Sequence, residues 1–593
     1  MGVGQVAEDK QEQRLEGVAA SPGIAIGPAF VLGGDVVHIF PRVLPEEEVP
    51  AEIERFKRAV EQARQELERI RQEVSRDLGE ESAKVFEVHQ LMLEDQVVIE
   101  ETIRRIRNER KNADLVFYEV MRAMQNSLGA GGGEYFRARA ADVRDVKRRV
   151  IRHIQGQRHD HLAPLAEPAI IVASDLSPSD TVSLDKAKVL GFATDLGGRT
   201  SHAAILARSL ELPSVVGLGR ISAVVQTGQW MILDGLQGVV VVNPSPETVA
   251  KYRQRQEEFC QLQRRLERLR DLPARTLDGK DVELSANIEF PEEIDSVVAH
   301  GAQGVGLFRT EYLYLSGNGL PAEEEQYKAY RMVVEGVAPN PVIIRTFDLG
   351  GDKIPEEQSG QPEANPFLGR RAIRICLEHP ELFKTQLRAI LRASAHGQVR
   401  LLLPMISSVD ELLQVKRIIA EVKKELDQRG LDYDRDMELG IMIEVPSAAL
   451  TADQLAAEVD FLSIGTNDLI QYTLAVDRGN QRVAHLFEGY HPAVLRLIRQ
   501  VVEAGHEGGI WVGMCGEMAS DPLATILLVG LDLDELSVSP VDLPRVKEIV
   551  RVISYEEARQ VAERVLRMRT AGEIKSYLQG VMREKFPELL EGV

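Results

Sequence analysis

The chain has 593 residues, 44% hydrophobic and 27% charged, a globular composition too long for one core, so three or four domains are expected. The formal net charge of −21 argues against nucleic acid as the main partner. The three cysteines are far apart in the sequence, which argues against a disulfide framework or a zinc knuckle and favours a reducing cytoplasm. No apolar run reaches about 18 residues, which argues against a membrane-spanning helix.

Residues 1–155 change from strand pattern to helix pattern. The stretch "GVAASPGIAIGPAFVL" at 17–32 predicts short strands and turns. Residues 45–155 predict an all-helical subdomain, interrupted by "LGAGGGEY" at 128–135. This subdomain is either a solvated helical hairpin without a function of its own or a docking surface for a partner. Its first apolar positions are spaced by four and three residues, as in a coiled-coil seam: Val49, Ile53, Phe56, Val60, Ala63, Leu67, Ile70 and Val74.

Strand and turn patterns return over residues 156–245, in "AIIVASDLS", "KVLGFATDLGG", "PSVVGLG" and "WMILDGLQGVVVV". We expect these strands and residues 1–44 to form one small β/α domain, with the helical block as an insertion. Residues 246–275 then predict a linker helix that ends at Pro273.

Residues 276–593 contain eight short apolar runs that alternate with helical stretches, which predicts a TIM (β/α)8 barrel in a multidomain α/β chain. The runs are "DVELSANIEF", "GVGLFRTEY", "PVIIRTFDLGGDK", "VRLLLPMIS", "LGIMIEVPS", "FLSIGTNDL", "IWVGMCGEM" and "ELSVSPVDL". In such barrels the active-site residues lie at the carboxyl ends of the strands. Five of the predicted strands end in polar or reactive residues, which are Arg309, Arg345 with Asp348, Glu444, Asn467 with Asp468, and Cys515.

These residue types indicate a site for a small phosphorylated carboxylic acid. Arg309, Arg345 and Arg478 can bind phosphate and carboxylate groups through two hydrogen bonds each. Glu444 and Asp468 are two carboxylates on adjacent predicted strands, which is typical of a Mg²⁺ site completed by substrate oxygens and water. A thiol between the glycines of "GMCGE" could act as a general acid or a nucleophile, or it could be an inert buried cysteine.

A separate candidate lies in "DLGGRTSHAAILARSLELPS" at 195–214, where Thr200 or Ser201 can cap a helix and leave His202 in its first turn. The positive end of the helix dipole favours neutral, nucleophilic imidazole and would stabilise a phosphoryl group attached to it. The chain has 12 histidines, so a structural or surface role for His202 is the alternative.

The motifs "GGRTSHAAILAR", "GLFRTEYL", "RTFDLGGDK", "NPFLGRRAIR", "IMIEVPSA", "SIGTNDLIQYTLAVDRGN" and "GMCGE" occur in this order. Together they resemble Enzyme I of the bacterial sugar phosphotransferase system, the phosphoenolpyruvate-protein phosphotransferase family. The resemblance covers nearly the whole chain, including "LMLED" and "AADVRDVKRR" in the helical block.

The resemblance implies a role for each candidate. His202 resembles the phosphorylated histidine of a swivelling phosphohistidine domain. Cys515 resembles the acid that protonates the departing enolate. Glu444 and Asp468 resemble the Mg²⁺ ligands. The implied phosphoenolpyruvate ligands are Arg309, Arg345, Arg371, Asn467 and Arg478.

The resemblance also implies partners and a location. The helical insertion would dock the histidine-containing phosphocarrier protein, the barrel would form a homodimer, and the small domain would swing between donor and acceptor in the cytoplasm. Arg370 departs from the aromatic residue that is common in the family, which adds positive charge and removes no role.

Other activities explain the sequence less well. A dikinase or synthase would phosphorylate the histidine from ATP, but no GxxxxGK[ST] loop occurs and no segment of about 200 residues is left for a nucleotide-binding domain. A plain aldolase-type barrel leaves residues 1–270 unexplained. A non-enzymatic regulatory paralogue would not need the complete set of catalytic residues.

Overall fold

The computed structural model describes residues 12–32, 41–78, 89–90, 92–93, 95–129, 134–156, 167–176, 188–198, 204, 207, 212–315, 320–350, 365–480 and 482–586. The chain divides into two compact units, residues 1–260 and 261–593. Among the described helices, none is long and apolar enough to cross a membrane.

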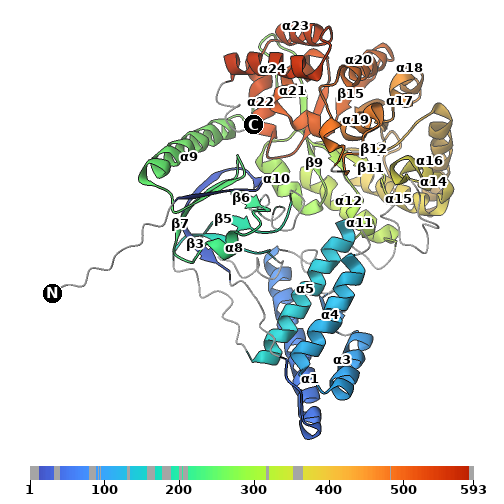
Figure 1. The fold of residues 1–593 in the computed structure, drawn as a ribbon. Helices are drawn as coiled ribbons and strands as arrows, with labels where there is room; N and C mark the ends of the chain where they lie inside the picture. The colour runs from blue at the N-terminus through green and yellow to red at the C-terminus, as the bar shows by residue number, and fades with distance from the viewer. Residues whose placement is uncertain are drawn as a thin grey trace. The chain divides into compact units, whose positions relative to one another are not determined.

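An eight-stranded sheet organises one part of the first unit (Figure 1). The order of its strands is β1-β8-β7-β3-β4-β5-β6-β2. β3 and β4 are parallel neighbours although the helical segment separates them in the chain, so this segment is an insertion, as predicted. The elements are β1 Gln13–Glu16, β2 Val18–Ser21, β3 Ile24–Val31, β4 Ala169–Ala173, β5 Val189–Thr194, β6 Ser214–Val216, α8 Ile221–Val224, β7 Trp230–Asp234 and β8 Val239–Val242.

The elements described in the inserted segment are all helices. Phe56, Ala63 and Leu67 of the predicted seam are buried against the other inserted helices, and the rings of Phe56 and Phe117 lie 5.5 Å apart. The seam therefore packs into a helical bundle within the unit. Its elements are η1 Glu46–Glu48, α1 Val49–Leu78, α3 Gln96–Glu109, α4 Ala113–Gly129 and α5 Glu134–Gln155.

A long polar helix, α9 Pro246–Glu267, contains the point at which the two units divide. Tyr252 in its first half is buried against the sheet of the first unit, and Leu262 in its second half packs on the core of the second unit. The domain limits given above remain a prediction.

The second unit is built on a closed barrel of eight parallel strands, which confirms the predicted TIM barrel. All eight strands fall within the eight apolar runs of the sequence. They are β9 Glu283–Ile288, β10 Val305–Phe308, β11 Val342–Arg345, β12 Val399–Leu403, β13 Leu439–Ile443, β14 Phe461–Ile464, β15 Trp511–Met514 and β16 Glu535–Val538.

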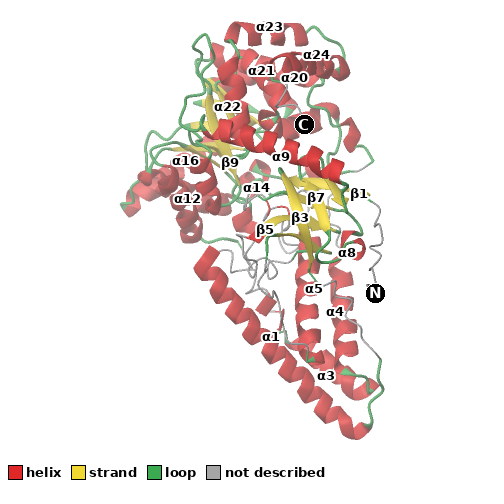
Figure 2. Ribbon diagram, turned by 90° about the vertical axis from the view of Figure 1, so that its left-hand side faces the viewer, coloured by secondary structure: helices red, strands yellow, loops and turns green. Residues whose placement is uncertain are grey.

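Helices follow the strands and cover the barrel from outside (Figures 1 and 2). Their apolar sides join one large core with the outer faces of the strands. They are η3 Pro291–Glu293, α10 Ile294–Ala299, α11 Tyr312–Leu315, α12 Glu323–Val337, η4 Pro366–Leu368, α14 Ile373–Glu378, α15 Pro380–Ala393, η5 Ser394–His396, α16 Val409–Arg429, α17 Pro446–Leu450, α18 Ala452–Ala456, α19 Thr466–Leu474, η6 Ala484–Leu486, α20 Pro492–Glu507, η7 Glu517–Ser520, α21 Pro522–Gly530, α22 Leu543–Val552, α23 Tyr555–Val565 and α24 Ala571–Lys585.

Large side chains fill the inside of the barrel. The rings of Phe461 and Trp511 are stacked with centroids 4.5 Å apart. A Cβ atom on Gly440 would come within 2.3 Å of the Phe461 ring, so a glycine is required there. The barrel is thus a packed core whose chemistry is confined to its ends.

Two acidic side chains begin neighbouring strands at the amino-terminal end of the barrel. Glu535 of β16 lies opposite Glu283 of β9 and is 2% exposed. Burial, and then the nearby Glu283 carboxylate, raise the pKa of Glu535 to about 8. The folded chain therefore prefers Glu535 in its protonated form.

We expect Glu535→Gln to stabilise the barrel near pH 8 and to change little near pH 5. The folded pKa lies above the ordinary 4.5, so wild-type stability falls as pH rises from about 4.5 to about 8. The neutral amide removes this loss. The expected gain near pH 8 is roughly 4 kcal/mol in the free energy of unfolding, measured by urea titration. The exposed Glu381→Gln is the control. An equal gain at both pH values would contradict the explanation.

Candidate active site

Arg345 ends β11 with its guanidinium held by carboxylates. Its Nη2 donates to Oε1 of Glu311 at 2.9 Å, and its Nη1 lies 3.4 Å from Oδ2 of Asp348. Burial by itself would lower the pKa of Arg345, but Glu311 and Asp348 outweigh it and raise the pKa. Among the described residues, the buried Nε has no hydrogen-bond acceptor. A buried donor of this kind suits an anionic ligand.

Glu311 is a residue that the sequence analysis missed. Its Oε1 accepts from the backbone N–H of Asp348 at 2.7 Å as well as from Arg345, so it fixes both groups. The available signal was an acidic residue two positions after the strand-end Arg309 in "LFRTEY".

Arg371 lies between two carboxylates. Its guanidinium contacts Asp348 at 2.7 and 2.8 Å and Asp468 at 2.9 and 3.3 Å. Burial would lower its pKa, but the hydrogen bonds and charges of Asp348, together with those of Asp468, raise it. The neighbouring Arg370 pairs instead with Glu378 at 2.7 Å.

Glu444 follows β13 and is 1% exposed. Its Oε1 accepts from the backbone N–H of Met405 at 2.6 Å. Burial, followed by the charges of Asp468 and Asp348, raises the pKa of Glu444 to about 8. The predicted carboxylates Glu444 and Asp468 are therefore close enough to repel one another.

Asn467 and Asp468 lie in the first turn of α19. The side-chain amide of Asn467 donates to Oε1 of Glu517 at 3.2 Å and accepts from the Glu517 backbone N–H at 3.0 Å. This pair ties α19 to the segment that follows β15, so the amide already has partners on both of its atoms.

Cys515 follows β15 and is 1% exposed, in the apolar cluster inside the barrel. The Ser463 hydroxyl donates to its Sγ at 3.2 Å. Burial raises the pKa of the Cys515 thiol to about 11, although Ser463 and Arg345 oppose this effect. The thiol is therefore protonated at neutral pH.

The two remaining arginines are more accessible. The Arg309 side chain is 33% exposed and forms an ion pair with Glu289. Arg478 is exposed, its backbone N–H donates to Oε1 of Gln471 at 3.1 Å, and its side chain has no ion pair with any described residue. Both guanidinium groups can turn toward a ligand without breaking a buried contact.

His202 lies outside the described residues. Of its segment, Ala204 and Ala207 are described, and both are helical and buried in the core of the first unit. The predicted helix position of His202 remains a prediction.

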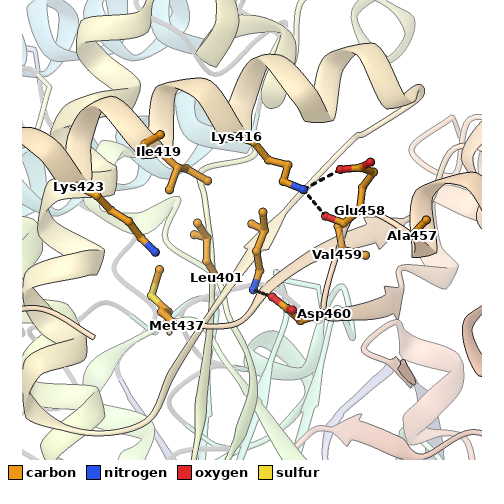
Figure 3. Close-up of a pocket in the computed structure, with 11 residues that line it drawn as sticks. Leu401, Lys416, Ile419, Lys423, Met437, Ala457, Glu458, Val459 and Asp460 are labelled. Carbon is orange, nitrogen blue, oxygen red and sulfur yellow. Dashed lines mark hydrogen bonds and ion pairs between the residues drawn. The ribbon is translucent and has the colours of Figure 1, made fainter. Parts of the chain in front are cut away.

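A pocket of about 460 Å³ lies elsewhere on the second unit (Figure 3). Its apolar wall includes Leu401 and Met437, and Lys416 at its edge donates to the carboxylate of Glu458 at 2.8 Å. It lies beside the amino-terminal ends of β12 to β14, whereas the candidate site residues follow the carboxyl ends, so it is not part of the site.

Comparison with protein families gives three matches along the chain. Residues 16–139 match the PEP-utilising enzyme, N-terminal model, residues 165–238 the mobile domain model, and residues 263–555 the PEP-binding domain model. Phosphoenolpyruvate-protein phosphotransferase from Bacillus sp. (strain S) is 45% identical over 569 residues, which cover 96% of this chain and 98% of that protein. The chain belongs to the phosphoenolpyruvate-protein phosphotransferase family. It is an enzyme, as predicted.

Other relatives agree. The phosphoenolpyruvate-protein phosphotransferase of Haemophilus influenzae is 42% identical over 96% of this chain and 99% of its own length. A solution structure titled Enzyme I (nEIt) is 41% identical, covers 41% of this chain and 99% of that chain, and has a TM-score of 0.36. The family assignment rests on the full-length relatives, which favour an enzyme over a non-enzymatic paralogue.

Proposed function

We propose that the chain transfers the phosphoryl group of phosphoenolpyruvate to His202 and then to the histidine of a phosphocarrier protein, the first step of sugar uptake by phosphorylation. The main support is that Arg345 and Arg371 contact carboxylates beyond the carboxyl ends of the barrel strands. Full-length similarity to enzymes named for this reaction supports it.

In this proposal, four arginines bind the phosphate and carboxylate of the substrate: Arg309, Arg345, Arg371 and Arg478. Arg345 is oriented before the substrate arrives, because Glu311 and Asp348 hold its guanidinium. Asn467 contributes its backbone N–H at the start of α19, since its amide already bonds to Glu517. Fixed donors lower the barrier mainly by positioning and by stabilising charge.

Glu444 and Asp468 would hold Mg²⁺. The donor set fits, because both are carboxylates and a Cβ atom on Gly465 would lie 2.9 Å from Oε2 of Glu444, so glycine keeps that oxygen open. Among the described residues, no group of three or more His, Cys, Asp or Glu forms a metal site, so substrate and water would complete the coordination. When bound, the ion would neutralise charge on the transferring phosphoryl group.

Cys515 would supply the proton that completes pyruvate. When the P–O bond of the substrate breaks, its electron pair stays on the enol oxygen and gives the enolate of pyruvate. The thiol proton then moves to the terminal carbon of the enolate and leaves a thiolate on Cys515. A thiol with a raised pKa is protonated and able to donate at neutral pH. Enclosure inside the barrel keeps bulk water away from Sγ.

The remaining parts of the proposal concern partners and location. We assign carrier docking to the inserted helices α1, α3, α4 and α5, dimerisation to the barrel, and activity to the cytoplasm. The division of the chain near residue 260 supports a small domain that moves between donor and acceptor.

The decisive experiment incubates the full chain with labelled phosphoenolpyruvate, Mg²⁺ and the carrier. We expect acid-labile phosphate on the chain and then on the carrier, with equimolar pyruvate. Label that comes from ATP but not from phosphoenolpyruvate would show that the chain is a dikinase or synthase.

Cys515→Ala should slow pyruvate formation about a hundredfold, because the enolate loses its proton donor. Stopped-flow coupling of pyruvate to lactate dehydrogenase measures this rate. The fold should be retained, since methyl for thiol is a small change of volume. Cys376→Ala, at the buried cysteine of α14, is the matched control. Equal rates for the two variants would make Cys515 a packing residue.

A further inference from the structure

The guanidinium of Arg371 has no donor left for a ligand in this structure. Arginine carries five N–H donors. Nε–H donates to Asp348, Nη2 to Asp348 and Asp468, and Nη1 to Asp468 and the hydroxyl of Tyr472. Every donor has an acceptor within 3.3 Å.

The same contacts involve both oxygens of Asp468. Oδ1 accepts from Nη1 and Oδ2 from Nη2, so the Arg371 fork lies across the whole carboxylate. A divalent cation at this carboxylate would face a guanidinium charge at hydrogen-bonding distance, and the two cations would compete for it.

The two edges of the guanidinium are held differently. The Nε–Nη2 edge is on Asp348, whose backbone N–H and carboxylate are fixed by Glu311 and Arg345. The backbone of Arg371 is also paired with Gly350, where a Cβ atom would lie 2.6 Å from the Arg371 side chain. The Nη1–Nη2 edge reaches Asp468 on α19, 97 residues further along the chain. Only this second edge can open without moving the backbone around Arg371.

We propose that Arg371 bridges Asp348 and Asp468 as a stand-in cation in the free enzyme, and that a divalent cation takes Asp468 and releases the Nη1–Nη2 edge to the substrate phosphoryl group. This Arg371 bridge rests on the proposed metal site of Glu444 and Asp468. The divalent cation therefore binds first and creates the second half of the phosphate site.

The test measures Mn²⁺ binding to the full chain without phosphoenolpyruvate, by electron paramagnetic resonance of free Mn²⁺. Arg371→Lys keeps the positive charge but cannot span two carboxylates with a planar fork. We expect it to bind Mn²⁺ about tenfold tighter than wild type, the equivalent of one charge-assisted hydrogen bond. Tyr472→Phe removes one acceptor of Arg371 and leaves both carboxylate contacts, so it should match wild type within about twofold.

Further variants distinguish failure of the Arg371 bridge from failure of the metal site at Glu444 and Asp468. Adding Glu444→Gln to Arg371→Lys should abolish the tighter binding. If the binding of Mn²⁺ depends on Glu444 but is equal in wild type and Arg371→Lys, the bridge is wrong and the metal site stands. If Mn²⁺ binding does not depend on Glu444 at all, the metal assignment fails and the bridge with it.

A crystal structure of the full chain with Mn²⁺ gives an independent reading. We expect an anomalous peak at Asp468, with both Arg371 contacts to the Asp468 carboxylate broken and the Arg371 contacts to Asp348 unchanged. Mn²⁺ on Asp468 with both Arg371 contacts to that carboxylate intact would overturn the proposal.

Discussion

His202→Ala should lower the rate of phosphoryl transfer to the carrier at least about ten-thousandfold, because the chain loses the nucleophile that forms the covalent intermediate. Binding of phosphoenolpyruvate in the presence of Mg²⁺ should survive, since the side chains assigned to it belong to the barrel. Labelled substrate with rapid acid quench measures the first property, and calorimetry measures the second.

The control is His506→Ala, at an exposed histidine near the end of α20 that bonds to Asp534. It should keep wild-type transfer. Acid-labile phosphate on the His202→Ala chain would identify another residue as the nucleophile. Loss of substrate binding together with transfer would contradict the assignment of binding to the barrel.

Glu444→Gln should cut turnover about a thousandfold and raise the Mg²⁺ concentration needed for half-maximal activity. The substitution keeps the size of the side chain and replaces a buried carboxylate with a neutral amide, a much poorer ligand for a hard cation. Steady-state rates over a Mg²⁺ titration, with circular dichroism to confirm the fold, test this expectation.

A matched control comes from the other end of the same strands. Glu458 lines the pocket of Figure 3 and pairs with Lys416, and Glu458→Gln should leave both turnover and Mg²⁺ dependence unchanged. Wild-type activity of Glu444→Gln at low Mg²⁺ would remove Glu444 from the metal site.

Local pattern predicted the barrel strand by strand. Parallel strands covered on both faces need uninterrupted apolar runs, and the four residues of β14, Phe461–Ile464, are all buried. Charged side chains then fall mostly at the two ends of the strands, as Glu535 does at the start of β16 and Glu444 does after β13. The same argument marked Cys515, whose burial and hydrogen bond from Ser463 no spacing could have shown.

The sequence pattern did not predict which charged side chains form pairs. Glu311 is separated from Arg345 by 34 residues and from Asp348 by 37, and in the sequence it is one of many acidic residues. Arg371 entered the site only through the family resemblance, as a ligand of the substrate. The structure adds that Arg371 contacts both Asp348 and Asp468, which no sequence pattern indicated.

The sequence by itself therefore determined the eight strands, the insertion of the helical block and the strand ends at which charged residues gather, because burial and periodicity act over a few neighbouring residues. The tertiary structure decided which guanidinium meets which carboxylate and which groups are buried. Those pairings depend on separations of about 3 Å between residues from different strands and helices, and closure of the barrel sets these separations.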